Sequence, residues 1–407
     1  MTKEIIVVDE VMGGGKTTAM LNFINEHPDR KFIYITPYLS EYDRVKSHCP
    51  AANFATPIKE KGSTKLGDIK RLMCDGRNIV STHALFRLFD LEAMDICRSQ
   101  DYTLILDEAM SVLEDYERLS PWDKDTLFKE FVDVGEDKRL RWRECEVEYK
   151  GRFYEEKRLC ETGSLEQYHK GRLIWTFPID AFLIFEEVYV LTYMFSAQIQ
   201  RYYYDLFDVK YRYMYVEGNS PQEYRLTDSP VKQGGGQDYS KLIHIFDKDK
   251  MNSIGDRKHD MSKGWYIRNR GNKAVFNRLR NNMSNYLRNI THAKSNDIIW
   301  TTFKNFRTEL EGRGYVKAFI PSNARATNEF RNRHHIIYPI NKYPNTTVKA
   351  YFASHGIKID EDAYALSEML QFIWRSAVRC GEEIWVYIPS RRMRDLLQGW
   401  IRENSKE

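Results

Sequence analysis

The feature that most constrains this chain is a glycine-rich turn near its start. The β-branched run Ile5–Val8 is typical of a buried strand, and the segment Lys16–Glu26 has the composition of a helix. Glycines let a backbone wrap round an anion, and the positive end of the following helix adds to the attraction. The sequence therefore predicts a phosphate-binding loop, formed by Met12, Gly13, Gly14, Gly15, Lys16, Thr17 and Thr18.

Two side chains of this loop have predicted roles. Lys16 would place its ammonium beside the β- and γ-phosphates of a nucleotide, and Thr17 would offer its hydroxyl to Mg²⁺. The strict pattern G-x-x-x-x-G-K-[ST] fails at its first position, which is Glu10, so the chain meets only the looser form of the motif. A chance glycine-rich turn is the competing interpretation, and the strand-loop-helix order makes it the minor one.

A pair of adjacent acids, Asp107 and Glu108, follows the apolar run Leu104-Ile105-Leu106. An aspartate at the carboxyl end of a buried parallel strand lies beside the phosphate loop of the same sheet, where it can hold Mg²⁺. Glu108 would then polarise the attacking water as general base. Such acids also often cap a helix. Together with the Lys16 loop, however, they predict Mg²⁺-dependent hydrolysis of a nucleoside triphosphate.

The order of elements predicts an α/β protein with mainly parallel sheets covered by helices. Short apolar runs alternate with longer segments that suit helices, as in sheets buried on both faces. The strand candidates of the first half are Ile5–Val8, Phe32–Thr36, Asn78–Ser81, Thr103–Leu106 and Val188–Thr192. Those of the second half are Ile243–Phe246, Ile298–Thr302, Val316–Ile320, His335–Ile340 and Ile384–Ile388, with helices at Asn272–Asn289 and Ala363–Arg379.

Turn-forming residues divide the chain into two predicted domains. A length of 407 residues suits two cores better than one. Two Ser-Pro pairs and the glycines at 234–236 predict a linker at 217–240, between a first domain at 1–216 and a second at 241–407. Dense charge with alternating acids predicts a β-hairpin insertion at 136–175 in the first domain.

Charge is distributed unevenly along the chain. Residues 1–216 carry 30 Lys and Arg against 37 Asp and Glu, whereas residues 217–407 carry 32 against 21. Most of the basic excess lies at 251–350, with 19 basic and 6 acidic side chains. A polyanion is therefore a plausible partner of the second half, although charge alone supports a solvated basic face equally well.

Composition argues against several other classes of protein. Hydrophobic residues make up 42% and charged residues 29%, as in ordinary globular domains, so disorder and fibres are excluded as the main theme. The longest apolar stretch, 176–198, is interrupted by three acids, and we expect no transmembrane helix. The first ten residues lack the features of a secretory signal, and the cysteines show no C-x-x-C spacing. We expect a cytoplasmic protein with free thiols.

Three polar residues near the end of the chain, Gln371, Arg375 and Arg379, are spaced four apart on a predicted helix. Positions i, i+4 and i+8 share one helical face. Arginines aimed across an interdomain cleft would stabilise the charge that builds on a transferring phosphoryl group. The alternative is an exposed basic face that meets solvent or nearby acids.

This order of motifs resembles superfamily 2 helicases of the DEAD/DEAH type. Asp107-Glu108-Ala109-Met110 looks like their motif II. Looser matches to motif Ia, the next strand-end motif, and motifs III, IV and V are found at 34–38, 80–83, 191–197, 298–303 and 323–328. The start Met-Gly-x-Gly-Lys-Thr-Thr and the later Ala-Thr-Asn are similar to the ATPase portion of herpesvirus-type replication-origin-binding helicases and their phage and mobile-element relatives.

The resemblance implies two RecA-like domains that bind ATP and Mg²⁺ between them and a nucleic-acid strand across both. It implies the catalytic residues Lys16, Asp107, Glu108, Gln371, Arg375 and Arg379, with Thr17 and Asp107 on the metal. It implies backbone contacts from Tyr38, Thr82, His83, Thr301, Asn323 and Thr327. The implied activity is that of a helicase or translocase in phage or mobile-element DNA replication or recombination, with DNA favoured over RNA as the partner.

Two other functions stay open at this point. A DNA-packaging ATPase related to large terminase subunits also joins a phosphate loop to an Asp-Glu pair. It would carry a nuclease domain with clustered acids, and residues 251–350 hold only 6. Alternatively, an ATP-gated protein could clamp nucleic acid without unwinding it.

Substitution of Arg379 tests the C-terminal motif. Arg379→Ala is expected to lower the turnover of ATP about tenfold or more, because an arginine that reaches the γ-phosphate stabilises charge mainly in the transition state. Affinity for ATP should stay close to that of the wild type. Steady-state hydrolysis and binding of a fluorescent nucleotide measure the two effects, and an unchanged rate would remove Arg379 from this role.

Overall fold

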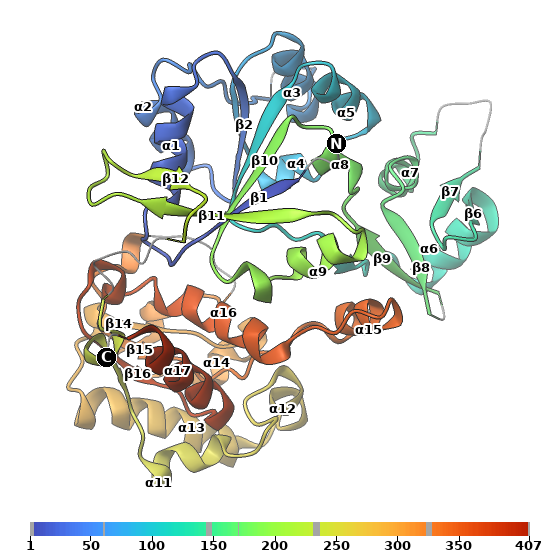
Figure 1. Cartoon of the computed structure of the whole chain (residues 1–407). Coiled ribbons are helices and arrows are strands. Elements are labelled where there is room, and N and C mark those ends of the chain that lie inside the picture. The colour runs from blue at the N-terminus through green and yellow to red at the C-terminus, as the bar shows by residue number, and fades with distance from the viewer. Residues whose placement is uncertain are drawn as a thin grey trace. The chain divides into compact units, whose positions relative to one another are not determined.

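The computed structural model divides into two compact units (Figure 1). Unit 1 comprises Met1–Val231 and Asn345–Ile359, and unit 2 comprises Lys232–Pro344 and Asp360–Glu407. The structure describes residues 4–59, 62–143, 149–169, 171–230, 237–322 and 328–405. The glycines at 234–236, on which the linker prediction rests, lie outside these described residues.

Unit 1 is built on a seven-stranded sheet with the order β12-β11-β1-β10-β4-β2-β3. All neighbouring strands are parallel except β11 and β12. The strands are β1 (Ile5–Asp9), β2 (Lys31–Thr36), β3 (Ile79–Thr82), β4 (Tyr102–Asp107), β10 (Glu187–Thr192), β11 (Tyr211–Glu217) and β12 (Arg225–Thr227). Each of the five apolar runs expected in the first half forms one of the parallel strands.

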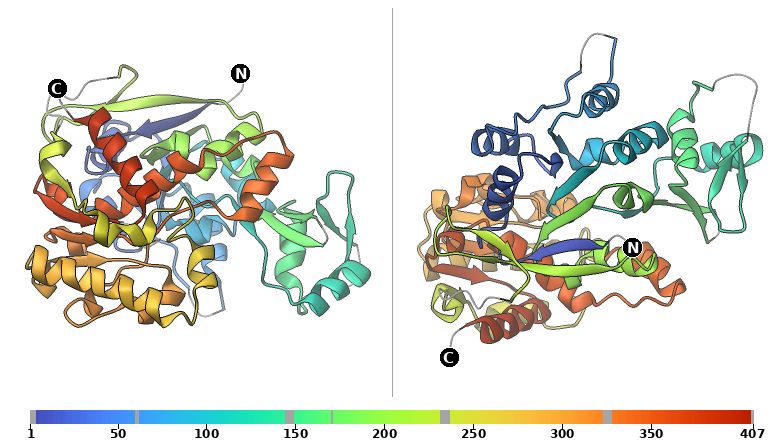
Figure 2. Two further views of the ribbon diagram at one scale, coloured as in Figure 1. Left: turned by 90° about the horizontal axis from the view of Figure 1, so that it is seen from below. Right: turned by 45° about the horizontal axis from the view of Figure 1, so that its top comes forward.

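The strands of this sheet bury side chains on both faces. Ile6 and Val8 of β1 lie in an apolar layer with α1 and α2. Ile5 and Val7 lie in the opposite layer with α3, α5 and α9. This alternation follows from the period of two along a strand, and Figure 2 shows helices on both sides of the sheet. The helices are α1 (Lys16–Glu26), α2 (Glu41–His48), α3 (Lys65–Cys74), α4 (His83–Phe86), α5 (Leu91–Arg98) and α9 (Ile199–Leu206).

An insertion of mixed structure separates β4 from β10. It contains a three-stranded antiparallel sheet, β5-β9-β8, and a separate hairpin of β6 and β7. In the range 136–175, where the sequence predicts a β-hairpin insertion, β8 and β9 pair as an antiparallel hairpin, and the range also contains a helix and part of a second sheet. The alternating acids at 144–148 lie outside the described residues. The elements are β5 (Leu113–Asp115), α6 (Pro121–Thr126), β6 (Val132–Val134), β7 (Leu140–Trp142), α7 (Tyr154–Glu161), β8 (Leu165–Tyr168), β9 (Arg172–Thr176) and α8 (Asp180–Leu183).

Helix α15 (Thr346–Ser354) belongs to unit 1, although the chain on either side of it belongs to unit 2. Its apolar side chains Val348, Tyr351 and Phe352 are part of the unit 1 core. The hydroxyl of Tyr351 also donates a hydrogen bond to Glu166 at 2.7 Å. The prediction of one continuous domain at 241–407 does not include this return of the chain to unit 1, because the residues that α15 packs against lie far away in sequence.

Unit 2 contains a four-stranded parallel sheet with the order β13-β16-β15-β14. Its strands are β13 (Ile243–Ile245), β14 (Ile298–Trp300), β15 (His335–Ile337) and β16 (Ile384–Tyr387). Its helices are α10 (Tyr239–Leu242), α11 (Asp249–Asn252), α12 (Lys263–Arg268), α13 (Lys273–Asn285), α14 (Arg307–Leu310), α16 (Glu361–Ile373) and α17 (Arg391–Asn404). Helices α12 and α13 share an apolar cluster with β14, β15 and β16.

Two sequence expectations for the second half are wrong. The expected strand Val316–Ile320 begins instead as a 3₁₀ turn, η7 (Val316–Ala318), and bonds to the sheet only through an isolated bridge of Phe319. The indole of Trp300 donates to the carbonyl of Tyr315 at 2.8 Å, which holds this turn across the end of β14. Part of the expected linker at 217–240 forms β12, which pairs with β11.

No helix in the described part of the chain combines the length and the apolar character that crossing a membrane would require.

Phe352→Ala tests the assignment of α15 to unit 1. The Phe352 side chain is fully buried, so its removal should cost about 3–5 kcal/mol of stability. Hydrogen exchange should show lost protection in β5, β8 and β9, with β14 to β16 little changed. Ala353→Ser, at an exposed site on the same helix, is the control. Lost protection confined to unit 2 would contradict the assignment.

Candidate nucleotide-binding site

The glycine-rich turn forms a loop between β1 and α1. Helix α1 begins at Lys16, and its N-cap residue, Gly15, has a φ of 88°. This left-handed conformation suits glycine and strains other residues. A Cβ atom on Gly14 would lie 2.5 Å from Cγ of Glu10, so a side chain there would collide with the loop itself. The loop is therefore a tight backbone cradle at the N-terminus of a helix, as the sequence predicts.

Lys16 lies within this cradle. Its ammonium donates hydrogen bonds to the carbonyl oxygens of Glu10 at 2.6 Å and Val11 at 3.1 Å. Burial lowers the pKa of Lys16, while the carboxylates of Glu10 and Asp9 oppose this shift. A phosphate oxygen would be a stronger acceptor than a backbone carbonyl, because it is charged. The loop thus keeps a cation in place for an anionic ligand.

Asp107 lies at the carboxyl end of β4, close to the start of α1. The hydroxyl of Thr17 donates to one of its carboxylate oxygens at 3.5 Å, and the hydroxyl of Tyr34 donates to the other at 2.9 Å. Burial raises the pKa of Asp107 to about 6, with a further contribution from Glu108. The strand register brings these groups together, because only β10 separates β1 from β4.

These residues fit a nucleotide with Mg²⁺. A hydroxyl and a carboxylate oxygen that converge are hard ligands of the kind Mg²⁺ takes from protein, with phosphate and water oxygens completing its shell. A nearby cation would also favour the charged form of Asp107, which burial now disfavours. Lys16 and the backbone N–H groups of the loop would hold the phosphates.

Glu108 has an unusual backbone. Its φ of 71° lies in the left-handed region, which costs a non-glycine residue about 1–3 kcal/mol. Its N–H donates to the carbonyl of Leu191 at 2.9 Å, so the bond to β10 holds the strained turn. Two residues on, the N–H of Met110 donates to the side-chain oxygen of Gln200 at 2.8 Å. The turn therefore has a fixed path, as a general base would need.

Asp9 is a site residue that sequence reasoning missed. Its two carboxylate oxygens accept hydrogen bonds from the N–H groups of Met194 at 2.7 Å and Phe195 at 2.8 Å. Burial raises its pKa, although these two bonds act in the opposite direction. Asp9 thus ties the start of the phosphate loop to the turn after β10, where the motif III resemblance lies. The available signal was an acid at the carboxyl end of the first strand.

Tyr224 is a second residue that the sequence did not indicate. A Cβ atom on Gly15 would lie 2.7 Å from Cδ2 of its ring, so the ring packs directly against the phosphate loop. The side chain of Asn22 donates to the carbonyl of Tyr224 at 2.9 Å and fixes this residue beside α1. The contact joins residues about 200 apart in the chain, so no local pattern could have revealed it.

The predicted nucleic-acid contacts of the first half lie beyond the carboxyl ends of β2 and β3. Tyr38 follows β2 and is half-buried. Thr82 ends β3, and its hydroxyl accepts a hydrogen bond from the N–H of Leu85 at 3.2 Å, which caps α4. His83 is buried, with only 8% of its surface exposed. Contact of any of them with nucleic acid stays a prediction, and the burial of His83 makes it the least accessible.

The structure offers less support for the nucleic-acid contacts that were predicted in the second half of the chain. Thr301 is fully buried at the end of β14. Asn323 and Thr327 lie outside the described residues. The aromatic residues Trp265, Tyr266 and Phe276, which lie among the basic residues of 263–280, are buried in the core of unit 2. Their helical spacing is typical of core residues, and their rings are not open to stacking with bases.

The C-terminal row of Gln371, Arg375 and Arg379 does not share one helical face. Helix α16 ends at Ile373, so only Gln371 lies on it. The hydroxyl of Ser376 donates to the carbonyl of Ile373 at 2.6 Å, and the chain then leaves the helical path. Arg375 is buried beside the ring of Phe372, at 5.3 Å from its centroid. Arg379 lies in a 3₁₀ turn and is half-exposed. Their predicted approach to the triphosphate stays a prediction.

The raised pKa of Asp107 predicts a pH-dependent stability. Because the folded protein binds this proton up to about pH 6 and the unfolded chain releases it near pH 4, stability should fall as pH rises between these values. Asp107→Asn removes the charge. The free energy of unfolding of the variant minus that of the wild type should therefore rise by on the order of 3 kcal/mol between pH 4 and pH 6. Above pH 6 this difference should stay constant.

Thermal unfolding of the nucleotide-free protein between pH 4 and pH 8 measures this effect. Asp43→Asn removes an exposed acid from the same unit and serves as the control. An equal difference between Asp107→Asn and wild type at both ends of the range would contradict the prediction.

Comparison with known proteins places this chain in a family. Residues 237–401 match the family model described as the YonV C-terminal Rossmann-like domain. The chain is 39% identical over 415 residues to the SPbeta prophage-derived uncharacterized protein YonV of Bacillus subtilis (strain 168), a match that covers 99% of this chain and 100% of that protein. A structure of S. tokodaii Xpd4 matches with a TM-score of 0.47 and 12% identity, over 98% of this chain and 94% of that one. On its identity to YonV along the whole length, the chain belongs to the YonV family.

Proposed function

We propose that this protein is a nucleic-acid-dependent ATPase of the helicase or translocase type, which binds ATP with Mg²⁺ at the loop of unit 1. The proposal rests on one observation. The hydroxyl of Thr17 and the carboxylate of Asp107, 90 positions apart in the sequence, lie 3.5 Å from each other beside a lysine held in a glycine cradle. Hydrolysis of a nucleoside triphosphate needs this combination of cation, metal ligands and nearby carboxylate.

Each residue has a distinct role in the proposed reaction. The backbone N–H groups of Gly13 to Lys16 and the ammonium of Lys16 bind the β- and γ-phosphates and stabilise the charge that develops on them. Thr17 and Asp107 hold Mg²⁺, which neutralises phosphate charge when bound. Glu108, on its fixed turn, orients the attacking water and accepts its proton.

Coupling to nucleic acid is the second part of the proposal. The order of motifs, similar to that of superfamily 2 helicases, supports it, as does the basic excess of residues 217–407. Asp9 gives a physical route, since it ties the phosphate loop to the turn at Met194 and Phe195. A movement of the phosphate loop on hydrolysis would be passed to this turn through the hydrogen bonds of Asp9. The YonV relative is described as prophage-derived, so we propose phage DNA replication or recombination, in the host cytoplasm, as the setting.

Of the two C-terminal arginines, Arg379 is the better candidate for a charge-stabilising role. It is half-exposed, whereas Arg375 is buried and reaches the carbonyl of Pro321 at 3.5 Å. An arginine that stabilises a transition state has to be able to reach its ligand. Arg375 would instead position the turn that carries Arg379.

The alternatives are separated by two measurements on the full chain. ATP hydrolysis is followed with and without single-stranded DNA or RNA, and strand separation is followed on a forked duplex. Hydrolysis stimulated by nucleic acid together with strand separation supports a helicase. Stimulation without separation favours a translocase or an ATP-gated clamp, and no stimulation by either nucleic acid would refute the coupling.

Lys16→Ala is expected to abolish hydrolysis, with a loss of about 10³-fold or more, because the phosphates lose their main protein cation. Lys65→Ala removes an exposed lysine from α3 and should leave the rate unchanged. Release of phosphate is the direct readout, and thermal unfolding shows whether both variants are folded. Full activity of a folded Lys16→Ala variant would exclude the proposed site.

A further inference from the structure

A long segment of unit 2 carries no acidic residue. Between Asp260 and Asp297 the chain has eight lysines and arginines and no Asp or Glu. In the structure this segment contains α12 and α13, followed by a π-helical turn, η4 (Tyr286–Ile290). A run of this length with one sign of charge is unusual, because basic side chains on helices are commonly balanced by acids three or four positions away.

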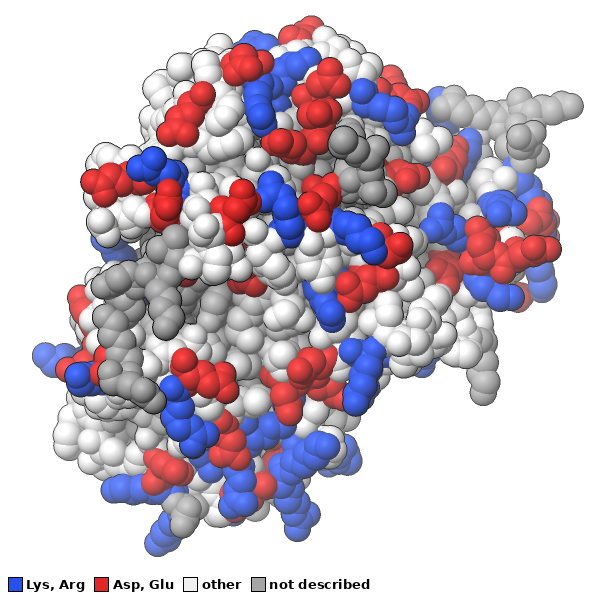
Figure 3. Space-filling view, in the orientation of Figure 1, with Lys and Arg blue, Asp and Glu red and all other residues white. Residues whose placement is uncertain are grey.

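The apolar and the basic side chains of this segment lie apart from each other. Phe276, Leu279 and Met283 of α13 point into the apolar cluster of unit 2. Apart from the half-buried Arg280, the basic side chains are exposed. We call the surface that they form the basic face. Figure 3 shows blue side chains gathered along the lower edge of the view, where Figure 1 places α11 to α13. The members of the basic face are Lys263, Arg268, Arg270, Lys273, Arg278, Arg280, Arg288 and Lys294.

The side chains of the basic face contact only uncharged groups in the described part of the chain. Arg278 donates to the hydroxyl of Ser253 at 2.7 Å, and Arg288 donates to the carbonyl of Arg313 at 2.7 Å. Arg270 lies over the ring of Phe306, at 5.3 Å from its centroid. None of the eight forms an ion pair with a described carboxylate, so their charge is available to an anion from outside the chain.

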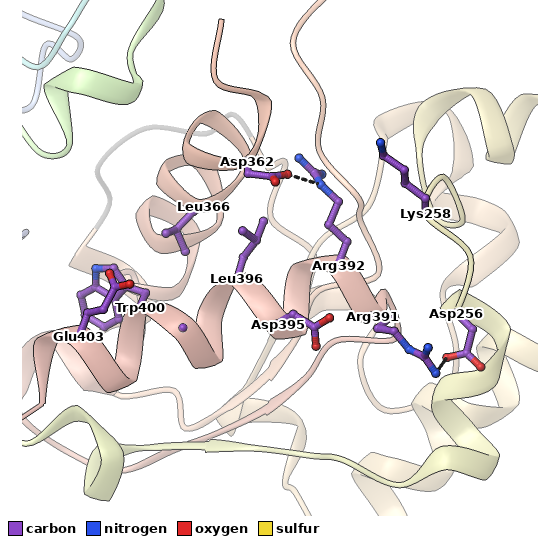
Figure 4. A pocket seen from close by; sticks show the side chains of 11 residues that line it. Asp256, Lys258, Asp362, Leu366, Arg391, Arg392, Asp395, Leu396, Trp400 and Glu403 are labelled. Carbon is purple, nitrogen blue, oxygen red and sulfur yellow. Dashed lines mark hydrogen bonds and ion pairs between the residues drawn. The ribbon is translucent and has the colours of Figure 1, made fainter.

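Helix α17 of the same unit shows the opposite arrangement. Its first turn also carries arginines, but Arg391 pairs with Asp256 at 3.2 Å and Arg392 pairs with Asp362 at 2.7 Å (Figure 4). These pairs line a pocket of about 560 Å³, which is also lined by Lys258, Asp395 and Glu403, so its acids outnumber its basic groups. The pocket therefore gives no comparable case for an anionic ligand, and the basic face is distinct from it.

The charges of the basic face do not help to stabilise the helix that carries them. Lys273 lies in the first turn of α13, and that turn contains no acid. A cation near a helix N-terminus is unfavourable by about 0.3–1 kcal/mol at low salt. Neighbouring cations on one face repel each other as well. A ligand that neutralises these charges would explain why they are gathered there.

The surface between the cations indicates the kind of ligand. Besides its cations, the exposed polar side chains of α13 are the amides of Asn277 and Asn281, which can donate to phosphate oxygens. The Trp, Tyr and Phe side chains of the segment are buried, so none of these large rings is offered to unpaired bases. Helix α13 is about 20 Å long by its rise per residue and can run beside several phosphates of a duplex.

We infer that the basic face binds the phosphate backbone of double-stranded nucleic acid without reading its sequence. The inference rests on the proposed nucleic-acid role of the protein, but it does not require hydrolysis at the Lys16 loop. The face lies on unit 2 and uses none of the residues of the nucleotide site. It would hold a duplex by charge while the motor acts on nucleic acid elsewhere.

The test uses a triple variant, Lys263→Gln, Arg268→Gln and Lys273→Gln, made in the full chain. These three side chains are exposed and form no hydrogen bond with another described residue, so the variant should fold. Binding to a 20-base-pair duplex of arbitrary sequence is measured as a function of salt. If all three contact phosphate, affinity in 0.1 M salt should fall about 10²–10³-fold, and the slope of log K against log salt should decrease by about 3.

A matched control removes the same charge from unit 1. Arg98→Gln, Arg118→Gln and Lys129→Gln replace exposed residues that are each ion-paired with an acid. This control should lose little affinity and keep the salt slope. Basal ATP hydrolysis without nucleic acid should be unchanged in both triple variants. Lys16→Ala should still bind the duplex, which separates failure of this inference from failure of the proposed hydrolysis.

Three results would overturn the inference. The first is equal affinity and salt slope in the two triple variants. The second is a larger loss of affinity for a single strand of the same length and sequence than for the duplex in the basic-face variant. The third is a loss of binding to vesicles of anionic phospholipid in the basic-face variant while its duplex binding stays intact, which would assign the face to a membrane surface.

Discussion

The parallel pairing of β1, β10 and β4 is the constraint on which the candidate site depends. Parallel neighbours end at the same edge of a sheet, so three turns from distant parts of the sequence meet there. The first is the phosphate loop after β1, the second carries Met194 after β10, and the third carries Glu108 after β4. The hydrogen bonds of Asp9 and Asp107 then tie these turns to one another and to α1. A shift in strand register would separate Thr17 from Asp107, the two proposed ligands of Mg²⁺.

The fold of the first sheet could be predicted from sequence because its signals are local. The parallel strands are continuous apolar runs, and the phosphate loop stands directly between its strand and its helix. The residues that complete the site could not be predicted in this way. Tyr34 reaches Asp107 from the neighbouring strand β2, and Tyr224 reaches Gly15 from the segment just before β12. Such contacts depend on tertiary packing, and no periodicity in the chain reports them.

The errors in the second half have a similar origin. The spacing of Gln371, Arg375 and Arg379 fits a helix, but the hydroxyl of Ser376 and the carbonyl of Ile373 bond to each other and end it. The run Val316–Ile320 has the composition of a strand, yet the bond from Trp300 to Tyr315 shapes a turn instead. The aromatic residues between the arginines of α12 and α13, by contrast, follow the usual rule for helical spacing, because their rings turn inward and leave the charge outside.

Helix α15 makes unit 1 discontinuous along the chain. Its closing segment, Asn345–Ile359, is synthesised only after the whole of the intervening part of unit 2, Lys232–Pro344. At roughly 5–20 residues per second, a ribosome needs roughly 6–26 s to add the stretch from Val231 to Ile359. During this time the surface that receives Val348, Tyr351 and Phe352 lacks its cover. The order of folding in the cell should therefore be interleaved, because unit 1 is completed only when much of unit 2 has already left the ribosome.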